Sequence, residues 1–497
     1  MTGTGEKIIV AALMIILPGC GKFRPAGADI SFERAAAAVN SGAESLGGFP
    51  RDQIGYMLYD LESRKIVREH NRDRAFIPAS TTKVPVTVAA LDILGPDYRF
   101  TTSIAGSGPI DRGVLNGDIW LKGTGDPLLT VSDLMDMADR LREKGVRSVS
   151  GHFYYDESDL VASRSIDNAM EPDVSFNSGL SALSLEYNSI TAEWKRDKKN
   201  GGMNIFLTPS LPSNSVSLAP EKLKENVKFV YSAKNRTEAW LFSPEEKNDG
   251  SDRLPVKDPA RYTAYVFAKI CGLRGIALPA PEPGTLPSRT DTLCVHYGMP
   301  LSSIADLTLT YSINLMAELM ALSAAKKLSG KALGLAGSAS AIAGYYSSRM
   351  ERINWKGLRL VNGSGLTVRN RITPEQMMAF LVYADAQDYL GKKFISFLPV
   401  SGWKWSLHNR FQTPDTQFRV WAKTGSINYA LALAGYLFTA SNHKMAFVIF
   451  MNDIDARRTY DADPDRRSRE SMRRVYAWQN NAKNVMDSIV TGWIRDR

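Results

Sequence analysis

The sequence predicts an α+β fold with more than one domain, on three observations. The chain has 497 residues, more than a single hydrophobic core usually serves. Strand-like runs broken by Gly, Pro and Asn fill residues 98–299, which contain one clear helical pattern at 132–144. Helical patterns return on both sides of this stretch, and three strand-like runs follow near the C-terminus, at 418–423, 430–437 and 444–451.

The flanking elements follow from local patterns. Two strand-like runs at 55–60 and 66–69 flank a polar turn, which predicts a β-hairpin. Residues 81–94 end at Gly95-Pro96, a glycine stop followed by a proline, which predicts a helix. Short turns join the three C-terminal strands, and short turns imply an antiparallel sheet. Further helices are expected at 315–328 and 482–493.

The domain organisation follows from the change of pattern along the chain. We expect residues 21–97 and 300–497 to form one domain, and residues 98–299 to form one or two domains inserted into it.

The N-terminus resembles an export signal. Lys7 precedes an apolar run, Ile8 to Leu17, which is too short to span a bilayer. Its end, Leu-Pro-Gly-Cys, is similar to the lipobox of bacterial lipoproteins, in which the cysteine is lipidated. We expect residues 1–20 to be a signal peptide, Cys20 to carry the lipid, and the protein to be exported to the periplasm or cell envelope, anchored to a membrane. A simple cleaved signal and an uncleaved anchor are the alternatives.

Charge and cysteine content narrow the function classes. The net charge is +9, yet no basic stripe with interleaved aromatics and no zinc-finger or RNA-binding motif is present, so nucleic acid is not an expected partner. The arginine-rich stretch 457–474 also carries acidic residues, which predicts a mixed-charge solvated loop. No metal site and no cofactor are expected, because HExxH and CxxC are absent. Cys271 and Cys294 either pair or stay as two buried thiols.

Three short motifs carry the chemistry. Ser80-Thr-Thr-Lys83 is S-x-x-K, Ser312-Ile-Asn314 is S-x-N, and Lys423-Thr424-Gly425 is K-T-G. Such a set, in this order, is typical of β-lactamases and penicillin-binding proteins. Each motif alone is weak: a serine before a helix is usually an N-cap, and a lysine on a strand is usually exposed. Their joint occurrence, each in a fitting structural setting, favours catalysis.

The spacing of the motifs has a chemical reason. Residues three apart share a helix face, so the Lys83 amine can reach the Ser80 hydroxyl and accept its proton. Lysine has an ordinary pKa of about 10.4, so this task requires burial beside a second cation, for which Lys423 is the candidate. Ser312 would relay a proton to the leaving amine, and Asn314 would hold Lys83 and the substrate. Lys423 and Thr424 would bind the substrate carboxylate, Gly425 would let the strand approach, and the N–H groups of Ser80 and Ser426 would hold the oxyanion.

With these motifs the chain resembles the D-alanyl-D-alanine carboxypeptidase/endopeptidase family of penicillin-binding protein 4 type. Further shared segments are Pro78-Ala79, Gly117 to Leu121, Gly123 to Pro127, Asn362 to Leu366, and Ala432 to Tyr436. The resemblance implies a transpeptidase-like domain, an antiparallel sheet flanked by helices, with β-rich domains inserted between the first two motifs. It implies peptidoglycan stem peptides as substrates and β-lactam antibiotics as covalent inhibitors.

Four positions bear on the substrate. Asn362 stands where the family usually has Asp, Val368 interrupts the usual Ser-Arg order, and Trp405 stands where Gly is common. Asp156 resembles an inserted-domain aspartate that contacts the peptide side chain; a turn-forming aspartate is the alternative.

The leading hypothesis is a serine-type D-alanyl-D-alanine carboxypeptidase that forms an acyl-enzyme on Ser80, with DD-endopeptidase activity as a further possibility. A β-lactamase is one alternative, although no E-x-x-L-N stretch is present. A non-catalytic wall-binding or penicillin-sensing lipoprotein is the other.

Overall fold

The structure of the protein is a computed structural model that describes residues 30–34, 48–197, 202–234, 237–246 and 248–496. The predicted signal peptide, with Cys20, lies outside the described residues. Within the part of the chain that is described, none of the helices has both the length and the apolar character needed to cross a membrane.

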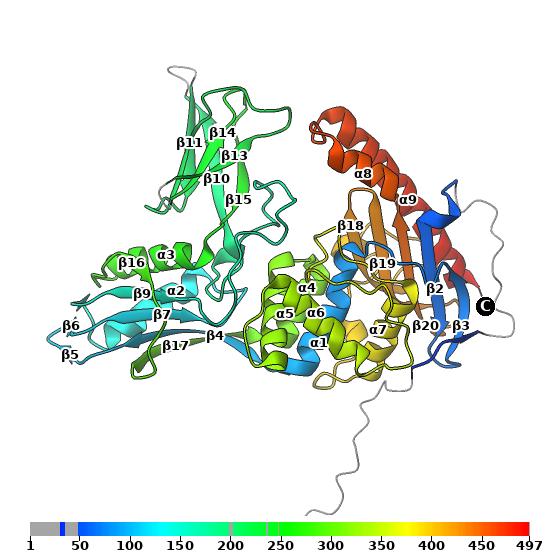
Figure 1. Ribbon diagram of the computed structural model, residues 1–497, viewed down its shortest axis with the longest axis horizontal. Helices are drawn as coiled ribbons and strands as arrows, with labels where there is room; N and C mark the ends of the chain where they lie inside the picture. The colour runs from blue at the N-terminus through cyan, green and yellow to red at the C-terminus, as the bar shows by residue number, and fades with distance from the viewer. Residues whose placement is uncertain (1–29, 35–47, 198–201, 235–236, 247, 497) are drawn as a thin grey trace, which may run out of the picture.

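A six-stranded sheet forms the centre of one half of the molecule (Figure 1). Its order is β1-β3-β2-β20-β19-β18, and only the β1–β3 pair is parallel. The predicted hairpin and the three predicted C-terminal strands are therefore confirmed. The strands are β1 (Glu33–Arg34), β2 (Ile54–Asp60), β3 (Lys65–His70), β18 (Val420–Ile427), β19 (Ala430–Phe438) and β20 (Lys444–Asn452).

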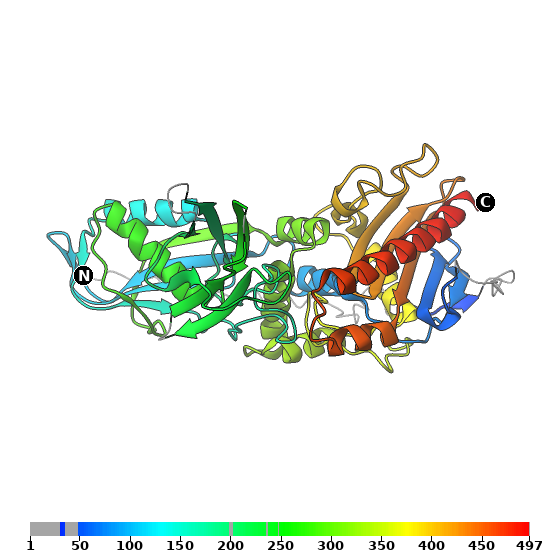
Figure 2. The same ribbon diagram turned by 90° about the horizontal axis from the view of Figure 1, so that it is seen from above.

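Helices cover both faces of this sheet. The long helix α9 (Arg469–Arg495) packs on one face, where Trp493 shares a core with Leu433 and Leu437 of β19 (Figure 2). Ala432 and Ala434 of the same strand point to the opposite core, because successive side chains of a strand alternate between faces. That second core is covered by α1 (Lys83–Leu94), α4 (Leu301–Tyr311), α5 (Asn314–Ser329), α6 (Leu335–Ser347) and α7 (Pro374–Ala386).

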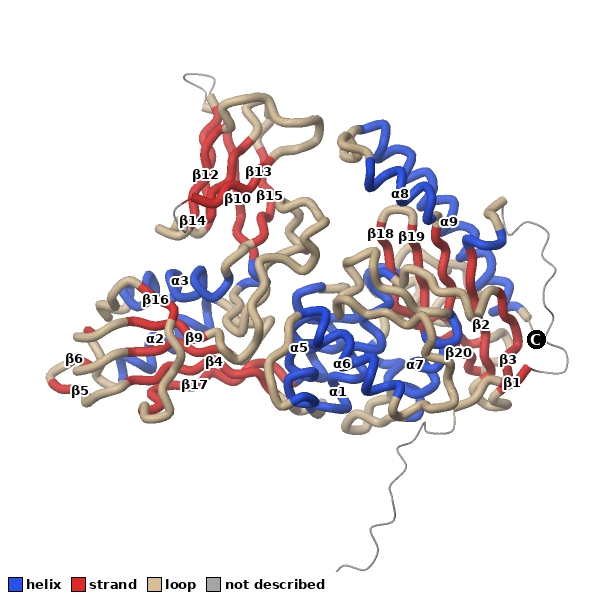
Figure 3. The backbone as a smooth tube through the Cα atoms, viewed as in Figure 1, coloured by secondary structure: helices blue, strands red, loops and turns tan. Residues whose placement is uncertain are grey.

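Residues 99–300 form the other half of the molecule around a separate core (Figures 1 and 3). A five-stranded sheet, β16-β9-β7-β4-β17, lies against helices α2 and α3, and two three-stranded sheets, β11-β10-β15 and β12-β14-β13, project from it. A small sheet β5-β6-β8 completes it. Both Cys271 and Cys294 are free, buried thiols in this core. The two separate cores support the proposed division of the chain at residues 98 and 299.

Two α-helices and fourteen strands lie in the described part of this half. The helices are α2 (Val131–Glu143) and α3 (Pro259–Leu273), and the strands are β4 (Arg99–Gly106), β5 (Ile110–Asp111), β6 (Val114–Leu115), β7 (Ile119–Gly123), β8 (Ser148–Val149), β9 (Phe153–Asp156), β10 (Ser189–Arg196), β11 (Met203–Thr208), β12 (Asn214–Leu218), β13 (Phe229–Lys234), β14 (Thr237–Phe242), β15 (Gly250–Pro255), β16 (Pro281–Pro283) and β17 (Asp291–Pro300).

Two expectations near the C-terminus were wrong. The stretch 457–474 is largely helical: it contains most of α8 (Ile454–Ala462) and the start of α9. Arg457 pairs with Asp461 one turn later, and the Ser468 side chain caps α9 by accepting from the Ser471 N–H, so local charge and capping favour helix here. The first of the three predicted C-terminal strands also continues farther than the expected end at residue 423, because β18 extends to Ile427.

Candidate active site

Ser80 lies in a short 3-10 turn, Ala79–Thr82, that leads directly into α1. The hydroxyls of Thr81 and Thr82 donate to the carbonyls of Pro78 and Ala79, which fixes this turn. The Ser80 side chain does not cap the helix; its Oγ lies 3.0 Å from Lys83 Nζ. The hydroxyl and the amine thus meet across one helical turn, as the S-x-x-K spacing predicts.

Lys83 is the first residue of α1 and is fully buried. Its Nζ also donates to Asn314 Oδ1 at 2.7 Å and to the Ser364 carbonyl at 2.7 Å. Burial lowers the pKa of Lys83 well below its ordinary value, and the charge of Lys423 lowers it further. A neutral amine keeps two hydrogens for these two acceptors and directs its lone pair at the Ser80 hydroxyl. The site therefore favours lysine as a base.

The S-x-N motif joins α4 to α5. Asn314 begins α5, and its Nδ2 donates to the Phe176 carbonyl at 3.0 Å, so the amide bridges Lys83 and the inserted half. Ser312 ends α4 in the left-handed region, with φ at 60°. Its hydroxyl has no hydrogen bond to any described residue, so the expected proton relay through Ser312 remains a prediction.

Glu318 was missed by sequence reasoning. It lies one turn after Asn314 on α5, is fully buried, and accepts from the backbone N–H groups of Gly363 and Ser364 at 2.8 and 2.7 Å. Burial raises its pKa. The carboxyl thereby fixes the loop whose carbonyl accepts from Lys83. The only sequence signal was the four-residue spacing from Asn314, which puts both side chains on one helix face.

Strand β18 brings the K-T-G motif against the serine turn. Lys423 is buried, its Nζ donates to the Thr424 carbonyl at 2.7 Å, and burial lowers its pKa to about 7. A Cβ on Gly425 would lie 2.7 Å from the Pro78 carbonyl oxygen and 3.0 Å from Ser80 N. Glycine is required by this close approach. Ser426 follows on the same strand, and its Oγ accepts from Gln479 of α9 at 3.4 Å.

These side chains form a serine-lysine site that the fold assembles from distant segments. The sequence profile of the family described as D-Ala-D-Ala carboxypeptidase 3 (S13) matches residues 35–471. The chain belongs to this family. The predicted resemblance is thereby confirmed, and the protein is a peptidase of the D-Ala-D-Ala carboxypeptidase type, a hydrolase.

Individual relatives agree with this family over most of their length. D-alanyl-D-alanine carboxypeptidase DacB of Haemophilus influenzae is 25% identical over 424 residues, which cover 80% of this chain and 85% of that protein. D-alanyl-D-alanine carboxypeptidase of an Actinomadura species is 26% identical over 429 residues, covering 80% and 77%. The crystal structure of penicillin-binding protein 4 of H. influenzae matches with a TM-score of 0.71 at 23% identity, over 80% of this chain and 90% of that one. The predicted α+β multidomain fold is confirmed.

Asp156, which was expected to contact the peptide side chain of the substrate, forms hydrogen bonds within the protein instead. It ends β9, is 1% exposed, and accepts from Lys122 Nζ at 2.7 Å and from the N–H groups of Ser158 and Leu286, both at 2.8 Å. Burial alone would raise its pKa, but these hydrogen bonds outweigh burial and the pKa is lowered. The contacts favour the alternative reading of Asp156 as a structural aspartate, since its carboxylate has no exposed surface to offer a substrate.

Asn362 and Trp405, two positions where the sequence differs from the residues usual in the family, each make local contacts near the candidate site. Asn362 is buried and its Oδ1 accepts from the Gly365 N–H at 3.1 Å, so it serves the turn beside Lys83. Trp405 is 60% exposed and meets the ring of Tyr311 edge-on at 5.0 Å. Because Tyr311 precedes Ser312, this aromatic pair borders the candidate site. Among the described residues, no group of three or more His, Cys, Asp or Glu side chains is placed to hold a metal ion.

Proposed function

We propose that the protein is a serine-type D-alanyl-D-alanine carboxypeptidase that works through an acyl-enzyme on Ser80. The observation that carries this proposal is the hydrogen-bonded pair of Ser80 Oγ and a buried Lys83 whose pKa is lowered. Ser80 Oγ attacks the carbonyl carbon of the penultimate D-alanine, and Lys83 accepts the hydroxyl proton. The tetrahedral intermediate expels the terminal D-alanine, whose amine takes up a proton. Water then hydrolyses the ester and frees Ser80.

The remaining motif residues are proposed to bind the substrate. Lys423 and Thr424 receive its terminal carboxylate, and the N–H groups of Ser80 and Ser426 hold the developing oxyanion, each donor worth about 2.7–4 kcal/mol in the transition state. Asn314 holds the peptide amide and Ser312 relays the proton. A leaving group from a cross-linked strand in place of D-alanine would give DD-endopeptidase activity by the same steps.

Labelled penicillin followed by mass mapping tests the nucleophile. We expect the label on the peptide that contains Ser80, no label in Ser80→Ala, and normal labelling in the matched control Ser217→Ala, whose serine is exposed on β12. Label on another residue would refute the assignment. Rapid release of hydrolysed drug would favour the β-lactamase alternative, and unchanged wall-peptide cleavage by Ser80→Ala would favour a non-catalytic role for the site.

Export is proposed on the N-terminal pattern and on the wall substrate of the family. The signal segment that precedes Cys20 would be removed, leaving Cys20 lipidated as the first mature residue and the enzyme on the membrane, facing the periplasm or cell envelope. Membrane fractionation of Cys20→Ala tests the anchor, because a variant that stays in the membrane fraction would contradict lipidation.

A further inference from the structure

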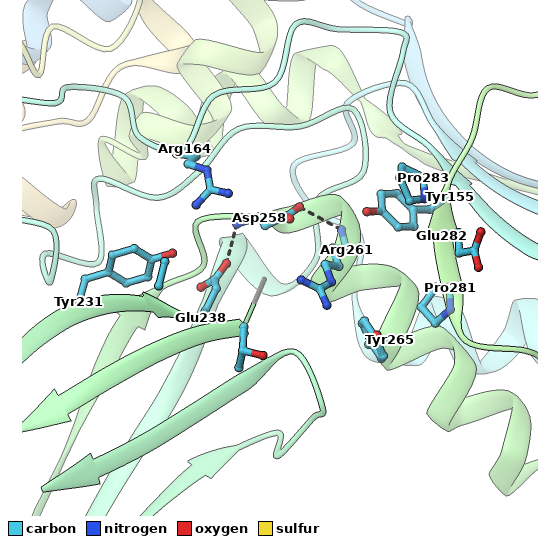
Figure 4. A pocket seen from close by; sticks show the side chains of 12 residues that line it. Tyr155, Arg164, Tyr231, Glu238, Asp258, Arg261, Tyr265, Pro281, Glu282 and Pro283 are labelled. Carbon is cyan, nitrogen blue, oxygen red and sulfur yellow. Dashed lines mark hydrogen bonds between the residues drawn. The ribbon is translucent and has the colours of Figure 1, made fainter. Parts of the chain in front are cut away.

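A cavity separate from the Ser80 site lies in the half of the molecule that contains residues 99–300 (Figure 4). It has a volume of about 520 Å³ and is bounded by β13, β14, the start of α3, and the edge formed by β9 and β16. None of the residues proposed to act with Ser80 lines it. Its polar side chains include Tyr155, Arg164, Tyr231, Glu238, Asp258 and Arg261.

Glu238 places a buried carboxyl group at this cavity. The residue is 9% exposed, and its Oε1 accepts from the backbone N–H groups of Lys257 at 2.8 Å and Asp258 at 2.6 Å. Its Oε2 makes no hydrogen bond with any residue in the described part of the chain. Burial raises the pKa of Glu238 to about 7. Near neutral pH this oxygen can therefore either accept a hydrogen bond or donate one.

Two arginines and one tyrosine that line the cavity have polar atoms without an ion-pair or hydrogen-bond partner among the described residues. Arg164 and Arg261 form no ion pair with any described residue; the Arg261 guanidinium lies over the Tyr265 ring at 5.5 Å. The Tyr231 hydroxyl is buried, and although Arg164 lies beside it, it makes no hydrogen bond of good geometry with any described residue. Buried polar groups are normally paired, because an unpaired one costs about 1–3 kcal/mol. The Tyr231 hydroxyl is such a buried group, whereas Arg164 is exposed and Arg261 is half-buried, so both guanidinium groups are open to a ligand that enters the cavity.

We propose that this cavity binds a carboxylate-bearing saccharide unit of the peptidoglycan glycan. The two guanidinium groups suit a carboxylate, with which arginine forms charge-assisted, often bidentate pairs. Tyr231 and Glu238 suit the hydroxyl and N-acetyl groups of such a unit, because a phenol and a carboxyl group can each donate or accept a hydrogen bond. The volume lies within the range of about 300–1,000 Å³ that is usual for small-molecule sites. The inference rests on the proposed function, which makes the wall polymer the substrate.

One loop connects this cavity to the Ser80 site. The chain between β9 and β10 supplies Arg164 to the cavity, and twelve positions later it supplies the Phe176 carbonyl that accepts from Asn314 at 3.0 Å. Between them, Asp167 lies 4.0 Å from Arg369. The same loop therefore contributes both to the cavity and to the surroundings of Ser80.

The test is a binding titration of the full chain by calorimetry, with two probes. The first is the disaccharide of N-acetylglucosamine and N-acetylmuramic acid, which has a carboxylate and no peptide; the second is neutral N,N′-diacetylchitobiose. We expect the acidic disaccharide to bind more tightly than the neutral one. Arg261→Gln and Tyr231→Phe should each weaken the acidic probe by roughly tenfold. The control Arg142→Gln, at an exposed arginine near the end of α2, should leave its binding unchanged.

Penicillin labelling of Ser80 in the same variants separates this inference from the proposed function. We expect wild-type labelling in all three variants, and unchanged disaccharide binding after Ser80 is acylated. The inference would be overturned if the acidic probe did not bind, or if Arg261→Gln left its binding unchanged. It would also be overturned if acylation of Ser80 abolished binding, because the sugar would then lie at Ser80. Absence of Ser80 labelling in the wild-type protein would instead overturn the proposed function. The titration would still decide whether the cavity binds the acidic disaccharide.

Discussion

At the scale of single residues, the site depends on two buried lysines with different tasks. In the proposed mechanism Lys83 is neutral when it accepts the Ser80 proton, whereas Lys423 is charged when it binds a carboxylate. Both pKa values are lowered, that of Lys83 by burial and by the charge of Lys423, and that of Lys423 to about 7 by burial. Their proximity keeps the charge on one of them, which suits the division of roles.

We expect a bell-shaped pH profile for kcat/KM on a small D-Ala-D-Ala substrate. Activity should rise with pH as Lys83 loses its proton, and fall again as Lys423 becomes neutral, near pH 7 in the free enzyme. Arginine stays protonated throughout this range, so Lys423→Arg should lose the alkaline limb, at a lower maximum rate. An alkaline limb that persists at the same pH in Lys423→Arg would show that another group causes it.

Glu318 is a positioning residue, because it acts through the backbone of residues 363–364. In Glu318→Gln one carboxylate oxygen is replaced by an amide NH₂, which cannot accept a hydrogen bond. The backbone N–H of Gly363 or of Ser364 would then be a buried donor without an acceptor. This should lower the free energy of unfolding by about 1–3 kcal/mol and slow Ser80 acylation, since the Ser364 carbonyl would shift from Lys83. Urea unfolding and penicillin kinetics measure both effects. The exposed Glu143→Gln on α2 should change neither, and an unaltered Glu318→Gln would contradict this role.

At the scale of elements, the approach of β18 to the serine turn sets the geometry. We expect Gly425→Ala to slow acylation by roughly a hundredfold, because its Cβ would push the strand off Pro78 and Ser80 and misplace the reacting groups. Gly492→Ala is the matched control: a Cβ there meets nothing within 4 Å on α9, and alanine in a helix should stabilise by about 0.5–1 kcal/mol. Rapid penicillin labelling measures the rate, and a Gly425→Ala variant with wild-type labelling would show that the approach is not needed.

Sequence patterns located these elements well where the signal was local. The glycine stop of α1 and the short turns between β18, β19 and β20 are properties of a few adjacent residues, and the structure confirms them. The helical start of α9 was missed, since its charged first turns lack the apolar periodicity that the prediction used; capping by Ser468 and burial of Val475 fix it.

At the scale of the whole molecule, ion pairs join the C-terminal segment to the inserted half. Arg467 contacts both oxygens of Asp173, at 2.9 and 3.0 Å, and Arg466 pairs with Glu171 at 2.8 Å. Asp173 and Glu171 belong to the same loop as Phe176, whose carbonyl accepts from Asn314. The segment before α9 therefore fixes the loop that borders the active site.

We expect Arg467→Gln to loosen this loop, because the Asp173 side chain is only 8% exposed and would lose its cation. Hydrogen exchange at residues 165–178 should become faster, and kcat/KM on cross-linked peptidoglycan should fall roughly tenfold, while penicillin labelling, which needs only the Ser80 cluster, should change by less than about twofold. Arg473→Gln, at an exposed arginine of α9, is the control. An equal loss of penicillin labelling would indicate a general folding defect instead.

The sequence by itself determined that Ser80 and Lys83, the proposed nucleophile and base, meet, because they are neighbours on one helical turn and need no tertiary contact to do so. It also determined the order of the motifs, and hence the family. The contacts of Lys83 with Asn314 and Lys423 were expected from the motifs, but only the tertiary structure shows them. Only the tertiary structure shows that Glu318 joins them, that Asp156 pairs with Lys122, and that a separate cavity lies beside Glu238. These features join residues that are far apart in the chain, and they depend on burial, which sets both the pKa values and the availability of each polar group.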